Sequence, residues 1–282
     1  MIKSILIPTD FSDNAGDALR YTLKFIGDRS VRLHIVHIIN VDAVQPEMKI
    51  DGLRLKEEYI ARAVQKMSVL EGLGQQYLSQ HTDADFTLTT KVLIGPTAKS
   101  IKHEAKYIQA DMIIMGTQGK HHTEVEKALG TVSTAVINQA PCPVLLIPRN
   151  YVYEPLGKVL FATNLDHHNP YELWRSLDLL SPHSVHIHCL HVAQEGQASD
   201  AVVADFGAYM IEHAPKAQTI FRSITAEDVE MSIADYSTRE QTQLIVMTRS
   251  KKSWWNQLMQ GRHTKRMIQW LDQPLLVLNE VG

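Results

Sequence analysis

The sequence predicts an α/β fold in two repeated domains, each a five-stranded parallel sheet with helices on both faces. Three observations lead to this prediction. Short, wholly apolar runs alternate with segments of helical period, which is typical of parallel strands buried between helices. Four sequence landmarks recur in the same order after about 150 residues. The chain has 282 residues, 44% of them hydrophobic, which is enough for two Rossmann-like domains with ordinary cores.

The repeat fixes the expected domain boundaries. Its matched segments are residues 3–10 with 158–164, 32–38 with 186–192, 111–117 with 243–249 and 140–146 with 271–277. We therefore expect one domain at 1–149, its repeat at 157–282 and a linker at 150–156.

The apolar last strands, Val144–Ile147 and Leu275–Leu278, would expose unpaired edges, which favour pairing. We expect them to pair antiparallel, so that the two domains pack as an internal pseudo-dimer. The alternative is that each of these strands pairs with another chain, as in a homodimer.

Local patterns predict the elements of the first domain. Ser12 is a suitable N-cap for a helix whose inner face carries Ala15, Leu19, Leu23 and Ile26. Later apolar stripes predict a longer helix through Ile60, Val64 and Met67 and a helix through Ile101, Ala105 and Ile108. Between them, alternating Phe86, Leu88 and Thr90, followed by Val92 and Leu93, predict a third strand.

The second domain repeats this alternation of strands and helices. Its first helix is marked by Leu173, Leu177 and Leu180. Thr225 and Asp228 resemble a capping box ahead of a later helix that carries Val229, Ile233 and Tyr236.

The segment 110–148 carries the clearest functional pattern. The buried strand Met112–Met115 leads into Gly116 and Gly119, and Gly130–Thr131 precedes the next helical segment. Backbone N–H groups in a glycine loop and at a helix N-terminus bind anions, because glycine admits close approach and the helix dipole favours negative charge. A phosphate-bearing ligand is therefore expected in the first domain, at the carboxyl ends of the strands.

At these residues the chain resembles the universal stress protein family, twice over and along nearly its whole length. The marks are residues 8–10 after the first strand, His37 in the second, Gly95 before the third helix, and the block 111–148. The family fold is a five-stranded parallel sheet with helices on both sides, and partners commonly join through the last strand. Members that carry the complete motif, G-x-x-G, nine residues, then G-S/T, bind ATP or AMP.

The resemblance implies roles for six residues. Asp10 would accept hydrogen bonds from ribose hydroxyls, and Ile38, at the end of the second strand, would line the adenine slot. The phosphates would accept hydrogen bonds from the backbone N–H groups of Gly116, Gly119, Gly130 and Thr131 and from the Thr131 hydroxyl. The implied ligand is ATP or AMP, with or without Mg²⁺.

The first domain departs from the family motif at one point. Ten residues, Lys120–Leu129, separate Gly119 from Gly130 where the family has nine. The longer loop could re-aim Gly119 without moving Gly130. A purely structural alternative also exists, since glycines are common in tight strand-to-helix turns.

The repeat has lost these residues. Asn164, Thr248 and Lys251 stand where the first domain has Asp10, Gly116 and Gly119. Gly261 persists, but Arg262 follows it in place of Ser or Thr. Side chains at 248 and 251 would fill space that phosphates need and restrict the backbone, so we expect nucleotide in the first domain only.

A basic and aromatic segment occupies this part of the repeat. Residues 241–271 contain no Asp or Glu, but include Trp254, Trp255 and Trp270 and six Lys or Arg side chains. One hypothesis is that the Trp254–Trp255 pair plugs the vacated pocket while the cations form a solvated face. The other is a surface that binds an anionic or aromatic partner, single-stranded nucleic acid included.

Composition excludes several classes of protein. The net charge of −3 and a pI near 6.5 give no general attraction for nucleic acid or anionic membrane. The chain has no run of about 18 apolar residues and no signal-peptide core. We therefore expect a cytoplasmic protein, in which Cys142 and Cys189, both beside or within apolar strand runs, are buried free thiols.

No catalytic residues and no metal ligands are predicted. There is no nucleophile elbow, His-Glu-x-x-His motif or complete P-loop. Among 14 histidines, His186 and His188 share a strand face, but no Cys or carboxylate partner stands at ligand spacing. The sequence therefore favours an adenine-nucleotide sensor of the stress response with an unidentified protein partner. The alternatives are a scaffold that acts through the Trp/basic surface and a weak ATPase.

Overall fold

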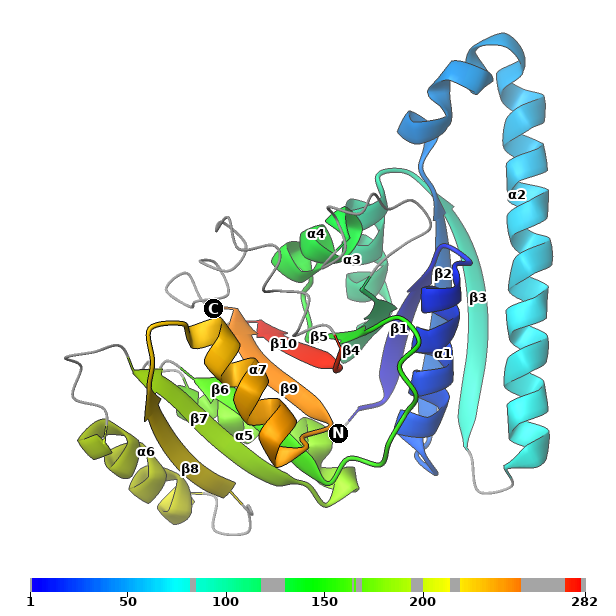
Figure 1. Cartoon of the computed structure of the whole chain (residues 1–282). Helices are drawn as coiled ribbons and strands as arrows, with labels where there is room; N and C mark the ends of the chain where they lie inside the picture. Colours follow the sequence, from blue (N-terminus) through cyan, green and yellow to red (C-terminus); the bar gives the residue numbers. More distant parts are fainter. Residues whose placement is uncertain are drawn as a thin grey trace. The chain divides into compact units, whose positions relative to one another are not determined.

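The computed structural model describes residues 2–81, 85–117, 130–163, 165, 169–193, 200–213, 219–249 and 272–279. The chain forms two compact units, Ile2–Tyr153 and Glu154–Gly282 (Figure 1). The linker expected at 150–156 stays a prediction. Each unit is described here by itself.

The first unit is a parallel sheet of five strands. They are β1 (Ser4–Thr9), β2 (Val31–Ile39), β3 (Phe86–Ile94), β4 (Met112–Gly116) and β5 (Val144–Ile147), in the order β3-β2-β1-β4-β5. The strands β4 and β5 are almost wholly buried, as their continuous apolar sequence indicates.

Four helices connect these strands. They are α1 (Asp13–Ile26), α2 (Val41–Gln80), α3 (Thr97–Tyr107) and α4 (Thr131–Gln139). Right-handed crossovers from β1 to β2 to β3 place α1 and α2 on one face, and the return through β4 to β5 places α3 and α4 on the other (Figure 1).

The start of α1 follows the sequence prediction. The Ser12 Oγ accepts the Ala15 N–H at 3.2 Å, and the inner face of the helix is buried. On α2 the prediction is wrong for Val64, which is 50% exposed. The buried face centres on Ala63 and Met67, and Val64, one residue beyond Ala63, lies about 100° further round the helix. The helix α3 ends one residue before Ile108, which is its C-cap.

The segment that leaves β5 packs on the outer side of α1. The Asn150 N–H donates to Asp17 Oδ2 at 2.8 Å, and Asn150 has a φ of 61°. The rings of Tyr151 and Tyr153 lie 6.0 and 5.1 Å from that of Tyr21, which is 1% exposed. Burial, together with these two phenols, raises the pKa of Tyr21 well above its ordinary value. The chain therefore remains attached to α1 as far as Tyr153.

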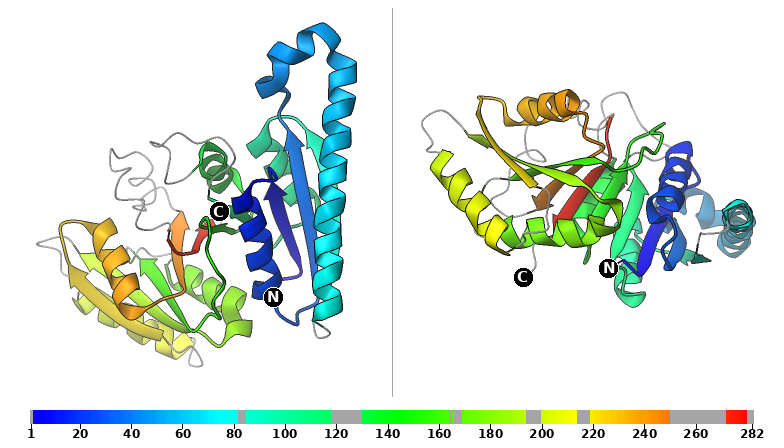
Figure 2. Two further views of the ribbon diagram at one scale, coloured as in Figure 1. Left: turned by 45° about the vertical axis from the view of Figure 1, so that its right-hand side comes forward. Right: turned by 90° about the horizontal axis from the view of Figure 1, so that it is seen from below.

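The second unit has the same strand order. Its strands are β6 (Lys158–Thr163), β7 (His186–Ala193), β8 (Thr219–Thr225), β9 (Leu244–Arg249) and β10 (Leu275–Asn279), all parallel, in the order β8-β7-β6-β9-β10. Its described helices are α5 (Asn169–Leu180), α6 (Asp200–His213) and α7 (Val229–Glu240), with a 3₁₀ turn at Ser181–His183 (Figure 2). The predicted fold class is confirmed. The antiparallel pairing of the two last strands stays a prediction.

The expected capping box in the second unit is wrong in one residue. Asp228 caps α7, since its Oδ1 accepts the Met231 N–H at 3.0 Å. Thr225 instead ends β8 and pairs with Ala193 of β7, so it belongs to the sheet. Cys142 and Cys189 are buried thiols outside any disulfide, as predicted, and burial raises the pKa of the Cys189 thiol. Among the described helices, none combines the length and hydropathy needed to cross a membrane.

Candidate functional site

The carboxyl edge of the first sheet gathers the predicted site residues that the structure describes. Thr9 of β1 pairs with His37 of β2. The residues that follow them, Asp10 and Ile38, therefore lie at the same level of the sheet edge. The strand β4 pairs with β1 on its other side and ends at Gly116, opposite Ile147 of β5. Ile38 is only 8% exposed, and β2 runs one residue beyond it. Residues 118–129, with Gly119 and the loop Lys120–Leu129, lie outside the described residues.

The turn from β1 to α1 fixes Asp10. The Phe11 N–H donates to Thr9 Oγ1 at 3.0 Å, and the Ser12 N–H donates to Asp10 Oδ1 at 2.9 Å. Phe11 has a φ of 59°, an uncommon value for a bulky residue that these two hydrogen bonds stabilise. The Asp10 carboxylate is thereby held at the N-terminus of α1, where negative charge is favoured.

His37 supports this turn from the neighbouring strand. Its Nδ1 lies 2.8 Å from the Thr9 carbonyl oxygen, which makes Nδ1 the protonated nitrogen, since a carbonyl only accepts. Its ring centroid is 4.4 Å from that of Phe11. The histidine that marks the second strand in the sequence therefore serves the fold of the edge.

Gly116 has a packing role that the sequence left as an alternative. A Cβ on Gly116 would lie 2.6 Å from Oδ1 and 3.0 Å from the backbone oxygen of Asn14. Asn14 is buried, and its Nδ2 donates to the Ile147 carbonyl at 3.0 Å. Glycine thus lets the first turn of α1 pack directly on the end of β4. Sequence reasoning missed Asn14; the available signal was a polar residue beside Ala15 and Ala18 on the buried face.

The two described ends of the glycine loop are joined to each other. The Gly130 N–H donates to the Thr117 carbonyl at 2.8 Å, and Ser133 Oγ donates to the same oxygen at 2.8 Å. Gly130 is buried and is the N-cap of α4, with a φ of −65° that any residue adopts. Its N–H is therefore engaged within the protein, which differs from the phosphate contact implied for it. The N–H groups that can meet an anion begin at Thr131.

The start of α4 is open to solvent at Thr131, which is exposed. No side chain of the described residues caps this end. The first N–H groups of a helix have no partner inside the helix, and the dipole adds partial positive charge there. This end of α4 and the Asp10 carboxylate stand on one sheet edge, because β1 and β4 are neighbours. The edge thus combines anion donors with a hydrogen-bond acceptor.

The described strand ends of the second unit repeat the threonine and the histidine of this edge. Leu165 donates its N–H to Thr163 Oγ1 at 2.9 Å, and His191 Nδ1 lies 3.1 Å from the Thr163 carbonyl oxygen. Thr248, half-buried near the end of β9, occupies the place of Gly116. Asn164, Lys251, Gly261 and the segment with Trp254 and Trp255 lie outside the described residues. Both hypotheses for the Trp/basic segment therefore stay predictions.

Comparisons with known proteins agree on one family. The model of the universal stress protein family matches residues 1–148. A universal stress protein of Methanocaldococcus jannaschii is 28% identical over 157 residues, which cover 53% of this chain and 84% of that protein. A second one from the same organism is 26% identical over 157 residues, which cover 53% of this chain and 96% of that protein.

A solved structure extends the likeness of fold to both units. The crystal structure of a universal stress protein from Archaeoglobus fulgidus superposes with a TM-score of 0.71 at 17% identity. The match covers 98% of this chain and 96% of that one. At this identity the likeness concerns the fold alone.

Proposed function

The chain belongs to the universal stress protein family, and from that premise we propose that its first unit binds one adenine nucleotide, ATP or AMP, as a regulatory module. The observation that carries the proposal is the exposed start of α4 at Thr131, on the same sheet edge as Asp10. The second unit carries no nucleotide in this proposal, and a protein partner responds to occupancy of the first.

The phosphates would bind at the start of α4. Backbone N–H groups from Thr131 onward and the Thr131 hydroxyl supply donors, and the helix dipole adds attraction for the negative charge. Gly130 contributes by closing the loop onto Thr117 rather than by donating its own N–H. A valine at position 130 would add a side chain at the start of α4, where the phosphates would bind.

The ribose would bind at Asp10. One carboxylate has about four acceptor positions, so the hydrogen bond from Ser12 leaves capacity for sugar hydroxyls. Ile38 would contribute an apolar wall for the base, although its small exposed fraction limits that contact to the end of the strand. Binding, rather than turnover, is the activity that these groups support, because none of them activates a water molecule.

Isothermal titration of the full-length protein with ATP and AMP tests the proposal. We expect one equivalent per chain. Asp10→Ala should weaken binding by about tenfold or more, because hydrogen bonds to a charged group contribute on that order. Asp10→Asn keeps an acceptor for the Ser12 N–H and should weaken binding less. Asp13→Ala removes a carboxylate that is 88% exposed one turn away, and serves as the matched control.

Two results would contradict the proposal. One is the absence of ATP and AMP binding to the wild-type protein at millimolar concentration. The other is two equivalents per chain, which would place a nucleotide in the second unit. Gly130→Val is the accompanying loop variant, and it should abolish binding while circular dichroism reports an unchanged fold.

A further inference from the structure

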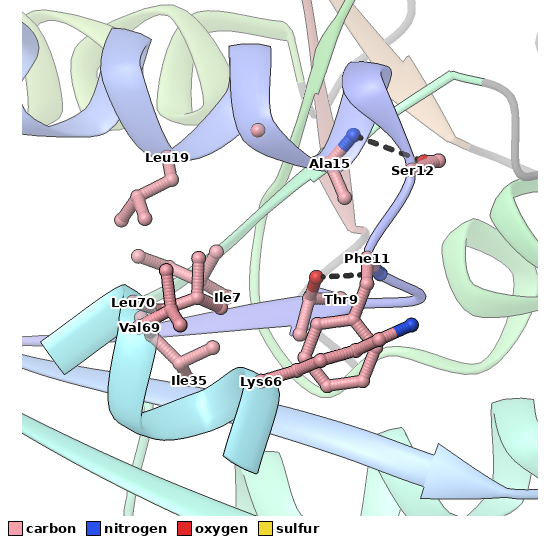
Figure 3. A pocket seen from close by; sticks show the side chains of 11 residues that line it. Ile7, Thr9, Phe11, Ser12, Ala15, Leu19, Ile35, Lys66, Val69 and Leu70 are labelled. Carbon is pink, nitrogen blue, oxygen red and sulfur yellow. Dashed lines mark hydrogen bonds between the residues drawn. The ribbon is translucent and has the colours of Figure 1, made fainter. Parts of the chain in front are cut away.

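A cavity of the first unit lies between the sheet and the two helices on one of its faces, next to the turn from β1 to α1 that holds Asp10. It has a volume of about 280 Å³. The sheet contributes Ile7, Thr9 and Ile35; the turn and α1 contribute Phe11, Ser12, Ala15, Gly16 and Leu19; and α2 contributes Lys66, Val69 and Leu70 (Figure 3). No residue of α4 is among the described residues that line the cavity.

The inner part of this cavity is apolar. Figure 3 shows Leu19 of α1 facing Ile7 and Ile35 of the sheet and the Val69–Leu70 turn of α2. The small residues Ala15 and Gly16 leave space on the α1 side. An apolar chain that enters this part of the cavity would leave water, and its binding would be favoured by roughly 25 cal/mol for each Å² of apolar surface that it buries.

The cavity continues into an apolar strip on α2. Val69 lines the cavity but is 62% exposed, and Leu73, one turn further along the same flank, is 47% exposed. Lys66 lies one turn before Val69 on this flank. The flank therefore presents a cation at one end and apolar side chains at the other.

Lys66 gives the cavity its charge. Its Nζ lies 5.2 Å from the centroid of the Phe11 ring, and Figure 3 shows its side chain along that ring. It is the charged member of the eleven lining residues, and no carboxylate is among them. Thr9 and Ser12, which also line the cavity, each accept a backbone N–H through the hydroxyl oxygen. Their own O–H hydrogens can therefore be donated to an anion.

We propose that this cavity binds a free aliphatic monocarboxylate of medium chain length, with its carboxylate at Lys66 and its chain between α1 and α2. A single cation beside an apolar cavity matches one anionic head and one apolar tail. The volume is at the lower end of small-molecule pockets, which favours a free acid over a whole lipid. Phosphates and the polar edges of a nucleobase would lack partners among the inner side chains. The inference does not rest on the proposed nucleotide site, although both sites border the turn from β1 to α1.

Titration of the full-length protein with decanoate, below its micellar concentration, tests this proposal. We expect saturable binding of one equivalent. Lys66→Met keeps the aliphatic stem and removes the charge, so it should weaken decanoate binding by about tenfold or more. The same variant should leave the binding of decanol unchanged. Lys99→Met, on the exposed side of α3, is the matched control and should match the wild type.

A second variant tests the cavity itself. Ala15→Leu would fill the space on the α1 side and should abolish decanoate binding, with thermal melting used to establish that the protein is folded. Gly130→Val should leave decanoate binding intact, which separates this inference from the proposed nucleotide site. No saturable binding of octanoate, decanoate or dodecanoate to the wild type would overturn the proposal. So would decanoate binding that is equal in wild type, Lys66→Met and folded Ala15→Leu.

Discussion

The carboxyl edges of the two sheets share a set of backbone-supporting contacts and differ in the residues at the candidate site. In each, the threonine that ends the first strand accepts the N–H of the residue two positions later, at 3.0 Å for Thr9 and 2.9 Å for Thr163. The residues that donate these N–H groups, Phe11 and Leu165, have the same φ of 59°. A histidine of the adjacent strand lies 2.8 or 3.1 Å from the threonine carbonyl oxygen.

The opposite edges of the sheets are equally alike. Asp111 Oδ2 accepts the N–H groups of Lys3 and Ser4 at 2.7 and 3.0 Å. At the matching place Gln243 Oε1 accepts those of Gly157 and Lys158 at 3.1 and 2.8 Å. One side-chain oxygen thus anchors the start of the first strand in each unit. A carboxylate serves in one unit and an amide in the other.

The difference between the units separates what the fold requires from what a ligand requires. The threonine and histidine pairs persist in a unit that has lost Asp10 and Gly116, so they belong to the fold. Asn164 and Thr248 stand at the matching positions of the second unit, so a sheet with this strand order forms without an aspartate and a glycine there. Gly116 is needed in the first unit because of its neighbour Asn14.

Exchanging the residues at this position should have the largest effect on stability. Gly116→Thr would drive a side chain into Asn14 and should lower the free energy of unfolding by about 1–3 kcal/mol, the usual cost of overpacking. The reciprocal change, Thr248→Gly, should cost about 0.5–1 kcal/mol through backbone entropy. Urea denaturation of the two variants measures both values. Equal costs would show that the two strand ends are packed alike.

Removing the strand anchors should have a smaller effect, again unequal between the units. Asp111→Ala leaves two N–H groups without a charged acceptor and should cost about 1–2 kcal/mol. Gln243→Ala removes a neutral acceptor and should cost about 1 kcal/mol or less. The same denaturation assay checks the order, and a larger loss for Gln243→Ala would contradict it.

Acid should have the smallest effect of the three, through a second matched pair of histidines. Burial, with Arg32 as a further cause, lowers the pKa of His34. Burial also lowers the pKa of His188. As the pH falls, these histidines therefore take up protons in the unfolded chain before they do so in the folded protein. The free energy of unfolding decreases as the pH drops through 6.5, the ordinary histidine pKa, and the loss is complete below the lowered pKa of the folded protein.

Asparagine variants assign this acid sensitivity. His34→Asn and His188→Asn should each reduce the difference in unfolding free energy between pH 7.5 and pH 5. The double variant should reduce it further. His103→Asn, at an exposed position of α3, is the control. An unchanged pH dependence in the double variant would assign the acid sensitivity to other groups.

The fold was predictable because its signals are local and repeated. Wholly apolar runs identified the buried strands, and the caps at Ser12 and Asp228 lie where side-chain oxygens precede apolar stripes. The errors concern surroundings that a linear pattern does not contain. Val64 fits a helical stripe, but the face that meets the sheet is centred elsewhere. Thr225 has the right spacing for a cap, but it is used by a strand.

The candidate site was predictable in position and less so in detail. The order of strands brings Asp10, Ile38, Gly116 and Gly130 to one edge, as parallel topology requires. That Gly116 contacts Asn14, and that the Gly130 N–H bonds to Thr117, depend on atoms distant in sequence. The cavity beside Lys66 has no sequence motif at all, because it arises from small residues on one helix facing the flank of another.

The helix α1 is fastened both to the carboxyl edge of the sheet and to the chain that follows β5. Its first turn carries Asn14, which lies against Gly116. Further along, Asp17 holds the Asn150 N–H, and the Tyr153 ring packs against the buried Tyr21. A change in the position of α1 would therefore be felt at once by the carboxyl edge of the sheet and by the chain that follows β5, because both are fastened to this one helix.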